Sequence, residues 1–297
     1  MLKKTFLSLL MAVGLTLGCS LTSHAETVLE RTARTGTLTV GMLTEAVPLS
    51  YVNDQGELVG YSVDLVNLIK KRVEEQLGRS IQVDFVVVTP QDWIPKVANG
   101  EIDLACNIGF TWDRDVFVDF SLPMARGGTK ILSKSGSGLG TPDSLKGKRI
   151  GVLPQTIAEQ VIKFVQPDAT FVQISTLEEG FQAVSSGRID ALAADVIALE
   201  GYRQTVNQPD AFTTTPAQPY NREGIACMVP ENNSKFLDIV NYTIVRLMQG
   251  YLEGEASSVA IVNRWFGSQG IINLDPQLIE NYFTEVINSR EQIRIKQ

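Results

Sequence analysis

Histidine is almost absent from this sequence. The 297 residues contain one histidine, His24, and it falls within the first 25 residues. That segment has the form of a secretory signal, with basic Lys3 and Lys4, an apolar stretch, and small residues for cleavage at Ser23-His24-Ala25. Cleavage there leaves a mature chain without histidine, which excludes Ser-His-Asp triads, Cys-His pairs and histidine-based zinc sites.

Long apolar runs and basic clusters are also lacking. The stretch Phe6 to Leu17 is too short to span a bilayer, and no later segment approaches the ~20 apolar residues of a membrane helix. No Lys/Arg cluster interleaved with aromatic residues follows residue 26, so the basic stripe of a nucleic-acid-binding protein is missing. Loss of residues 1–25 removes two lysines and no acids, which changes the formal net charge from −7 to −9. We therefore expect no membrane span and no nucleic-acid partner.

Cysteine is scarce, with three residues in the chain. Leu17-Gly18-Cys19 resembles the end of a lipoprotein box, but Thr16 stands where such boxes prefer Leu. We therefore favour ordinary cleavage and release into the periplasm over lipid anchoring at Cys19. Cys106 and Cys227 lie in apolar, strand-like runs, which favours buried free thiols, with a disulfide as the alternative in an oxidising compartment.

The remaining composition is that of a folded protein, with 44% hydrophobic and 20% charged residues. The length exceeds one compact domain, so two lobes are expected. Strand-like runs alternate with helical patterns, which indicates an α/β architecture with mainly parallel strands. The predicted strands are 37–42, 81–88, 102–108, 129–133, 149–153, 170–174, 189–193 and 224–229. The predicted helices are 63–77, 89–99, 156–165, 177–186, 234–248, 255–265 and 276–293.

Several boundaries carry specific signals. Thr89 followed by Pro90 predicts an N-cap and a first helical residue. Thr176 and Glu179 have the spacing of a capping box before the helix 177–186. The proline-containing stretch Gln208 to Pro219 is predicted to be a connector.

Short motifs follow one another in a characteristic order between residues 36 and 267. They are Gly36–Gly41, Gly56–Leu65, Gly100–Leu104, Thr111–Arg114, Val118–Ser121, Gly147–Val152, Gly187–Ala191 and Arg264–Gly267. Each motif alone is weak, but their order and spacing together are specific. The sequence resembles bacterial extracellular solute-binding protein family 3, the periplasmic polar amino-acid-binding proteins of ABC transporters, whose fold also forms glutamate-receptor ligand-binding domains.

The resemblance implies a two-lobed periplasmic-binding-protein-like fold of type II, in which two strands form the hinge. Lobe 1 would comprise 26–128 plus 223–297, including a C-terminal helical extension at 268–297, and lobe 2 would comprise 129–222. Periodicity alone does not indicate that the C-terminal part returns to lobe 1. We expect a monomer whose C-terminal extension docks on its own lobe, with partner binding as the alternative.

The resemblance also implies which residues hold an amino acid. Arg114 falls at the position of the carboxylate-binding arginine, whose planar guanidinium can form two parallel hydrogen bonds. Asp195 falls at the position of the ammonium-binding acid, where helix N-capping is an alternative or additional role. Backbone groups near Asn107 and Gly109, and the start of the helix at Thr156, would add polar contacts. Ligand contacts from both lobes would favour the closed state.

The sequence departs from the family pattern where the ligand's side chain would lie. Gly109 and Ile157 lack hydroxyl groups that many members use. Leu43, Ala46 and Leu49 replace acidic or aromatic residues of relatives, which disfavours a cationic ligand because its charge would lack a partner. Two nearby residues complicate this reading: Glu45 could supply an acid, and Trp93 either covers a small neutral side chain or packs within its helix.

These observations predict an exported solute-binding protein that captures a small neutral amino acid for an ABC transporter permease. One alternative is an orphan or sensory homologue that is not coupled to a transporter. Another is an enzyme of the dehydratase type on the same fold, which the absence of histidine and of an appended catalytic domain disfavours. No cofactor and no metal site are expected.

Overall fold

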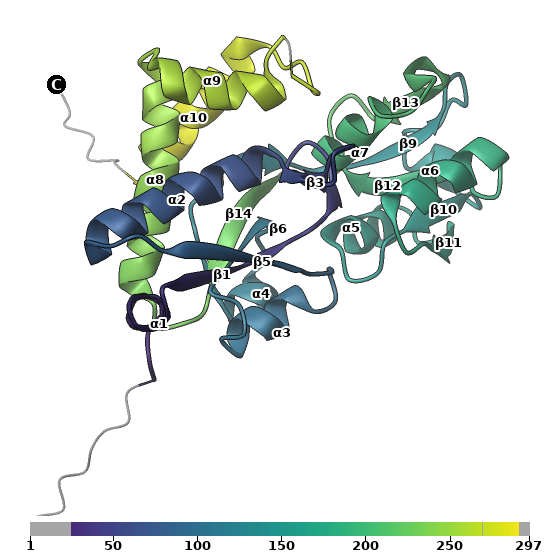
Figure 1. Cartoon of the computed structure of the whole chain (residues 1–297). Coiled ribbons are helices and arrows are strands. Elements are labelled where there is room, and N and C mark those ends of the chain that lie inside the picture. Colours follow the sequence, from purple (N-terminus) through teal and green to yellow (C-terminus); the bar gives the residue numbers. More distant parts are fainter. Residues whose placement is uncertain (1–24, 269, 291–297) are drawn as a thin grey trace, which may run out of the picture.

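The computed structural model describes residues 25–268 and 270–290. Two bodies lie side by side, each built on a β-sheet with helices packed against it (Figure 1). The predicted α/β architecture with two lobes is confirmed. The expectation of mainly parallel strands is wrong, because both sheets are mixed: the strands that return from the other body, such as β14 and β9, pair antiparallel with their neighbours. The predicted signal and the lipoprotein-like Cys19 lie outside the described residues. Within the described part, no helix is long and apolar enough to cross a membrane.

The first sheet combines strands from both ends of the chain. Its order is β5 (Gln82–Val87), β1 (Thr37–Met42), β6 (Leu104–Gly109), β14 (Glu223–Val229) and β7 (Asp119–Phe120), and β8 (Ala125–Gly127) also pairs with β14. The first three strands run parallel, whereas β14 runs antiparallel to β6. A segment more than 100 residues after β6 thus completes the first sheet.

Helices cover this sheet on both faces. They are α1 (Val28–Thr35), α2 (Tyr61–Leu77), α3 (Trp93–Ala98), α4 (Trp112–Asp115), α8 (Ser234–Leu252), α9 (Ala256–Phe266) and α10 (Pro276–Arg290). Leu65, Ile69 and Val73 recur at helical spacing on α2 and are fully buried, so this face of the helix packs into the core. The C-terminal helix α10 packs against α8, where Phe283 meets Tyr251 edge to face.

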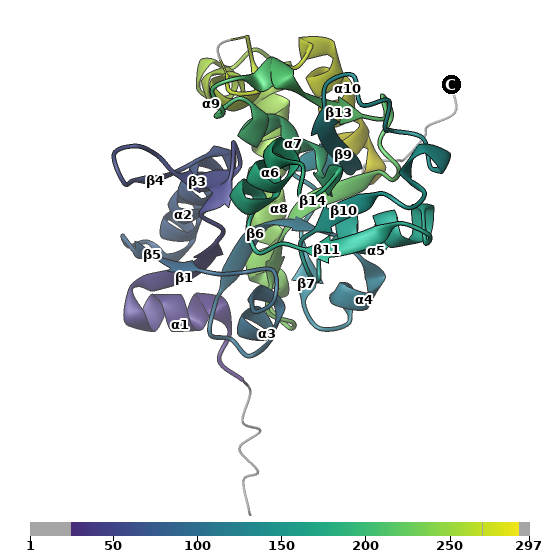
Figure 2. The same ribbon diagram turned by 90° about the vertical axis from the view of Figure 1, so that its right-hand side faces the viewer.

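The second sheet has the order β11 (Thr170–Gln173), β10 (Arg149–Val152), β12 (Ala191–Asp195), β9 (Thr129–Lys134) and β13 (Phe212–Thr215). Its helices are α5 (Ile157–Val165), α6 (Leu177–Ser186) and α7 (Val196–Arg203), with two 3-10 turns at Asp143–Leu145 and Pro209–Ala211. Figure 2 views the molecule from the side of this second body. Two apolar clusters, one on each face of the sheet, form its core.

The chain passes between the two sheets twice, after β8 and before β14. The crossings are hydrogen-bonded to each other: Thr129 N–H donates to Asn221 Oδ1 at 2.8 Å, and Tyr220 N–H donates to Thr129 O at 2.9 Å. This pair of segments is the structural counterpart of a two-strand hinge. The exact lobe bounds given above stay a prediction.

Several local features differ from the sequence-based prediction. The predicted connector 208–219 contains strand β13, which pairs antiparallel with β9. The predicted helix at Thr89 begins later, at Trp93, because Asp92 Oδ1 accepts the Thr89 N–H at 2.7 Å and closes a turn first. The three-stranded sheet of β2 (Glu45–Ala46), β3 (Ser50–Val52) and β4 (Leu58–Val59) was not predicted. Only one of the two predicted capping hydrogen bonds at α6 is present: Thr176 Oγ1 accepts the Glu179 N–H. The Glu179 carboxylate accepts the Ser175 N–H instead of the Thr176 N–H.

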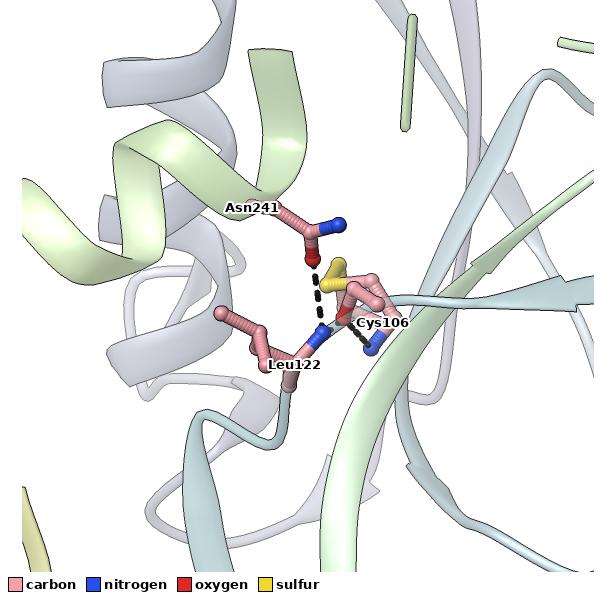
Figure 3. Close-up of a disulfide and its surroundings, with 5 residues drawn as sticks. Cys106, Leu122 and Asn241 are labelled. Carbon is pink, nitrogen blue, oxygen red and sulfur yellow. Dashed lines mark hydrogen bonds between the residues drawn. A yellow bond between two sulfur atoms is a disulfide. The ribbon is translucent and has the colours of Figure 1, made fainter. Parts of the chain in front are cut away.

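The expectation of free thiols is wrong, because Cys106 and Cys227 form a disulfide. The two residues lie opposite each other on β6 and β14, a pairing that depends on the late return of β14 to the first sheet. Figure 3 shows the surroundings of this bond, where Asn241 Oδ1 accepts the Leu122 N–H at 2.7 Å. Ser121 Oγ accepts the Cys227 N–H at 2.9 Å, so the backbone around the buried bond is hydrogen-bonded.

Candidate ligand-binding site

A cavity of about 160 Å³ lies between the two bodies, and every candidate site residue predicted from the sequence lines it. These nine residues are Leu43, Leu49, Trp93, Asn107, Gly109, Arg114, Thr156, Ile157 and Asp195. The cavity is also lined by residues that the sequence did not single out as contacts, chiefly apolar ones from both bodies and one acid, Glu223. The nine residues therefore lie together around one cavity, while the role of each in binding a ligand stays a prediction.

Arg114 reaches across the cavity from the short helix α4. Thr111 Oγ1 caps this helix by accepting the Arg114 N–H at 3.3 Å. The Arg114 guanidinium donates to the Gly109 carbonyl at 2.8 Å within the first body and to the Gln155 carbonyl at 3.1 Å in the second. Its carbon lies 5.9 Å from the ring centroid of Trp93, within cation–π range. Burial lowers the pKa of Arg114, but an arginine at this position stays charged.

Asn107 owes its position to a β-bulge. Ala226 pairs with Ile108 and Cys227 with Cys106, so Asn107 is an extra residue on β6 opposite none on β14. Its φ of 78° lies in the left-handed region, which asparagine tolerates better than most residues. Its Nδ2 is buried without a hydrogen-bond partner among the described residues, so the cavity contains a donor that a ligand could satisfy.

The start of α5 faces the cavity from the second body. Thr156 is the N-cap: its Oγ1 accepts the Glu159 N–H at 3.2 Å and donates to the Leu153 carbonyl at 2.8 Å. The N–H groups at the start of an α-helix have no partner within the helix, and the helix dipole favours an anion there. Because Ile157 begins this nine-residue helix, the predicted carboxylate contact has both a donor set and a favourable field.

Asp195 stands at the end of β12 and caps α7. Its Oδ1 accepts the Ile197 N–H at 2.9 Å, and its Oδ2 accepts the Gly128 N–H at 2.8 Å from the first crossing segment. The capping role considered from the sequence is therefore present, and the Asp195 carboxyl group is also hydrogen-bonded to the Ala198 N–H and to the Glu223 side chain. Burial raises the pKa of Asp195, and these N–H donors oppose the rise.

Glu223 is the residue that sequence reasoning missed. It begins β14 and lines the cavity, and its Oε2 is buried, with no hydrogen-bond partner among the described residues other than the Asp195 carboxyl group. Burial raises the pKa of Glu223 to about 8, with a further rise from Asp195 and an opposing effect from Arg114. The signal available in the sequence was an acid at the start of a strand directly after a crossing segment.

The cavity walls away from these polar groups are apolar. Leu43, Leu49 and Trp93 contribute from the first body, and Leu153, Leu177 and Ala198 contribute from the second. Trp93 packs with the core beneath α3 and also lines the cavity, while its role in covering a ligand side chain stays a prediction. Glu45, the acid considered near the cleft, is exposed and does not line the cavity.

The described residues contain no group of three or more His, Cys, Asp or Glu that could hold a metal ion. The cavity thus presents one cation, two carboxyl groups and apolar walls, all converging from two bodies. Such an arrangement can hold a small zwitterion through both of its charges.

The chain belongs to the bacterial extracellular solute-binding proteins of family 3, whose model matches residues 38–268. It is 29% identical over 270 residues to the glutamate/aspartate import solute-binding protein of Salmonella typhimurium, with 86% of each protein covered. It is 30% identical over 247 residues to the L-glutamate/L-aspartate-binding protein of Pseudomonas aeruginosa, covering 80% of this chain and 79% of the relative. Among solved structures, an ancestral arginine-binding protein bound to arginine matches with a TM-score of 0.68 and 27% identity, covering 78% of this chain and 99% of that chain.

Proposed function

We propose that this chain captures a small neutral L-α-amino acid between its two lobes and delivers it to an ABC importer. The observation that carries this proposal is that Arg114 and Asp195 come from different bodies and line one cavity. Arg114 and the start of α5 hold the α-carboxylate, while Asp195 accepts from the α-ammonium. The apolar residues around Leu43, Leu49 and Trp93 surround the side chain.

The proposed neutral side chain follows from the distribution of charge in the cavity. The relatives named above bind glutamate and aspartate, whose second carboxylate needs a second cation. Among the described lining residues Arg114 is the one cation, and the α-carboxylate uses it. The structural neighbour binds arginine, whose guanidinium needs an acid beside the side chain. Glu223 interacts with Asp195 and Arg114, so it lies at the α-ammonium end instead.

Closure of the two lobes is the proposed signal to the importer. Lobe 1 comprises 26–128 with 223–297, and lobe 2 comprises 129–222. Contacts between the lobes are both polar, such as Gln91 Nε2 to the Pro154 carbonyl at 3.4 Å, and apolar, such as the packing of Ile197 against the first body. A ligand that bridges the lobes adds to these contacts and shifts the equilibrium toward closure. We place the mature chain in the periplasm as a monomer, after removal of residues 1–25.

We also propose that the protein is not an enzyme. The Thr156 hydroxyl group, which lines the cavity, donates its proton to the Leu153 carbonyl and accepts the Glu159 N–H. A carbonyl oxygen is not a base that could activate this hydroxyl group as a nucleophile. Glu223 has the protonation state of a general acid, so the dehydratase alternative has one suitable group. Incubation of the protein with amino acids and hydroxy acids should return them unchanged by mass spectrometry, and formation of a dehydrated product would refute the proposal.

The test of the binding function is a thermal-shift screen of the mature protein against the twenty proteinogenic L-amino acids. Ligand-free protein is prepared by unfolding in guanidinium without reductant, dialysis and refolding, so that no co-purified ligand masks the shift. We expect one or a few neutral amino acids to raise the melting midpoint, because a ligand that binds only the folded state stabilises it by mass action.

Two variants connect the shift to the proposed contacts. Arg114→Ala and Asp195→Ala should each abolish it, since each leaves one charge of the zwitterion without a partner. Glu45→Gln, which changes an exposed acid outside the cavity, serves as the control and should keep it. Stabilisation by acidic amino acids alone would contradict the proposed neutral side chain.

A further inference from the structure

Glu223 lines the cavity at the point where the chain enters the first sheet from the second body. Its carboxyl group interacts with Asp195 and with Arg114, the two charged groups assigned to the ligand. Its Oε2 atom is buried, and apart from the hydrogen bond between the Glu223 and Asp195 carboxyl groups no described residue offers it a partner. A buried carboxyl group with so few hydrogen bonds is costly unless a ligand or water supplies more.

The space for this carboxyl group is provided by Gly109. A Cβ atom at Gly109 would lie 2.7 Å from Glu223 Oε2 and 2.5 Å from Ile157 Cδ1, closer than van der Waals contact allows. The Glu223 carboxyl therefore fills the volume into which a side chain at position 109 would project. An acid from β14 thus occupies the space beside Gly109, the position at which the family resemblance implies a hydroxyl group in many members.

The charges in the cavity leave Glu223 facing the ammonium end of an amino acid. Arg114 is engaged by the α-carboxylate, so Asp195 and Glu223 remain as two acids beside one ammonium group. On the other side of β14, the charged and titratable residues nearby are Arg126, Arg222, Tyr282 and Glu285. Arg126 is ion-paired with Glu285 and lies over the Tyr282 ring. Arg222 is exposed and donates to Gln218 Oε1 at 3.4 Å, so none of these described groups forms an ion pair with Glu223.

We propose that Glu223 is a second ammonium-binding residue that acts with Asp195, and that the site selects a primary α-ammonium and releases a proton when it binds one. This inference rests on the proposed function, because it assigns a role within the same amino-acid site. A primary ammonium has three N–H donors for the carboxylate oxygens of Asp195 and Glu223. A secondary ammonium has two, and its added methyl group takes the place of the third donor among these oxygens.

The proton balance follows from the proximity of the two acids. Two buried carboxyl groups in contact do not both ionise readily, so the empty pair holds one proton between them. An arriving ammonium brings one positive charge and its own donors. The shared proton then leaves for the buffer, and both carboxylates accept hydrogen bonds from the ammonium.

Isothermal titration calorimetry tests the proton release directly. The probe is the amino acid from the twenty-member panel that gives the largest thermal shift, titrated at pH 7 in buffers of different ionisation enthalpy. We expect release of about one proton per bound amino acid and an affinity that rises about tenfold per pH unit from pH 6 to pH 8. In Glu223→Gln both effects should disappear, because glutamine cannot ionise, whereas the control Glu45→Gln should behave as wild type.

A second readout concerns selectivity and separates ligand contact from a structural role. The N-methyl derivative of the same amino acid should bind wild-type protein at least tenfold more weakly than the parent, because it has one donor fewer. This ratio should shrink in Glu223→Gln. No proton release in the wild type, or an unchanged ratio in the variant, would overturn the role of Glu223 while leaving amino-acid binding intact. Absence of binding by all twenty amino acids would instead overturn the proposed function, and this inference with it.

Discussion

The protonation of Glu223 predicts an unusual dependence of stability on pH in the ligand-free protein. Its pKa rises from the ordinary value of 4.5 in the unfolded chain to about 8 in the folded one, mainly through burial. Between these values the folded state holds a proton that the unfolded chain has lost. The unfolded state therefore binds fewer protons, and this group makes stability fall as pH rises from about 4.5 to 8.

The size of the effect follows from the same values. One pKa unit corresponds to about 1.4 kcal/mol, so the raised pKa of Glu223 would cost at most about 5 kcal/mol of folding free energy, a loss that is complete by about pH 8. Half of this upper limit would lower the melting midpoint of a chain of this length by about 5 °C or more. Glu223→Gln removes the effect, because the amide has nearly the same shape and stays neutral.

The assay is differential scanning fluorimetry of refolded, ligand-free protein from pH 4 to pH 9. We expect wild type and Glu223→Gln to melt within about 1 °C of each other at about pH 4, below the ordinary carboxyl pKa, and to diverge by about 5 °C or more at about pH 9, with the variant more stable. Glu45→Gln should follow the wild type throughout, since its carboxyl group is exposed. A difference between wild type and Glu223→Gln that is constant with pH would refute the buried, protonated carboxyl.

Three further predictions concern the scaffold around the site. The double substitution Cys106→Ser with Cys227→Ser should lower the unfolding free energy by about 2–5 kcal/mol in urea titrations, because the disulfide closes a long loop, and an unchanged midpoint would contradict this. Gly201→Val should weaken amino-acid binding at least tenfold in calorimetry with little change in ligand-free stability. The reason is that a side chain at position 201 would overlap the Val47 carbonyl oxygen across the cleft. Wild-type affinity in this variant would show that the close contact between Gly201 and Val47 does not matter for binding. Phe283→Ala on α10 should cost about 3–5 kcal/mol of unfolding free energy in urea titrations, because Phe283 is buried against α8. The affinity for the amino acid, measured by calorimetry, should not change, since Phe283 lies away from the cavity.

The elements with clear periodicity could be predicted from the sequence. Strand β1 and helix α6 have the predicted bounds, because alternating burial marks the strand and Thr176 and Gly187 mark the ends of the helix. Strand β13 was missed since it has four residues, half-buried and next to prolines, so its stability comes from pairing with β9. Short elements of this kind depend on their neighbours in space rather than on a local pattern.

The site was predictable where it follows the family's order of motifs. Arg114 and Asp195 could be assigned in this way, and both line the cavity. Glu223 and the disulfide could not, because both depend on how β14 aligns with β6, including the bulge at Asn107. Register between strands more than 100 residues apart is set by tertiary packing, and no local signal in the sequence reports it.

The central claim is that one amino acid is held by both of its charges, at Arg114 and at Asp195 with Glu223. Competition calorimetry with three forms of the best-binding amino acid tests it most directly: the free amino acid, its methyl ester and its N-acetyl derivative. The methyl ester removes the carboxylate charge, and the acetyl group removes the ammonium charge. We predict that only the free amino acid binds, with each derivative weakened at least a hundredfold. Binding of either derivative with the affinity of the free amino acid would contradict the account.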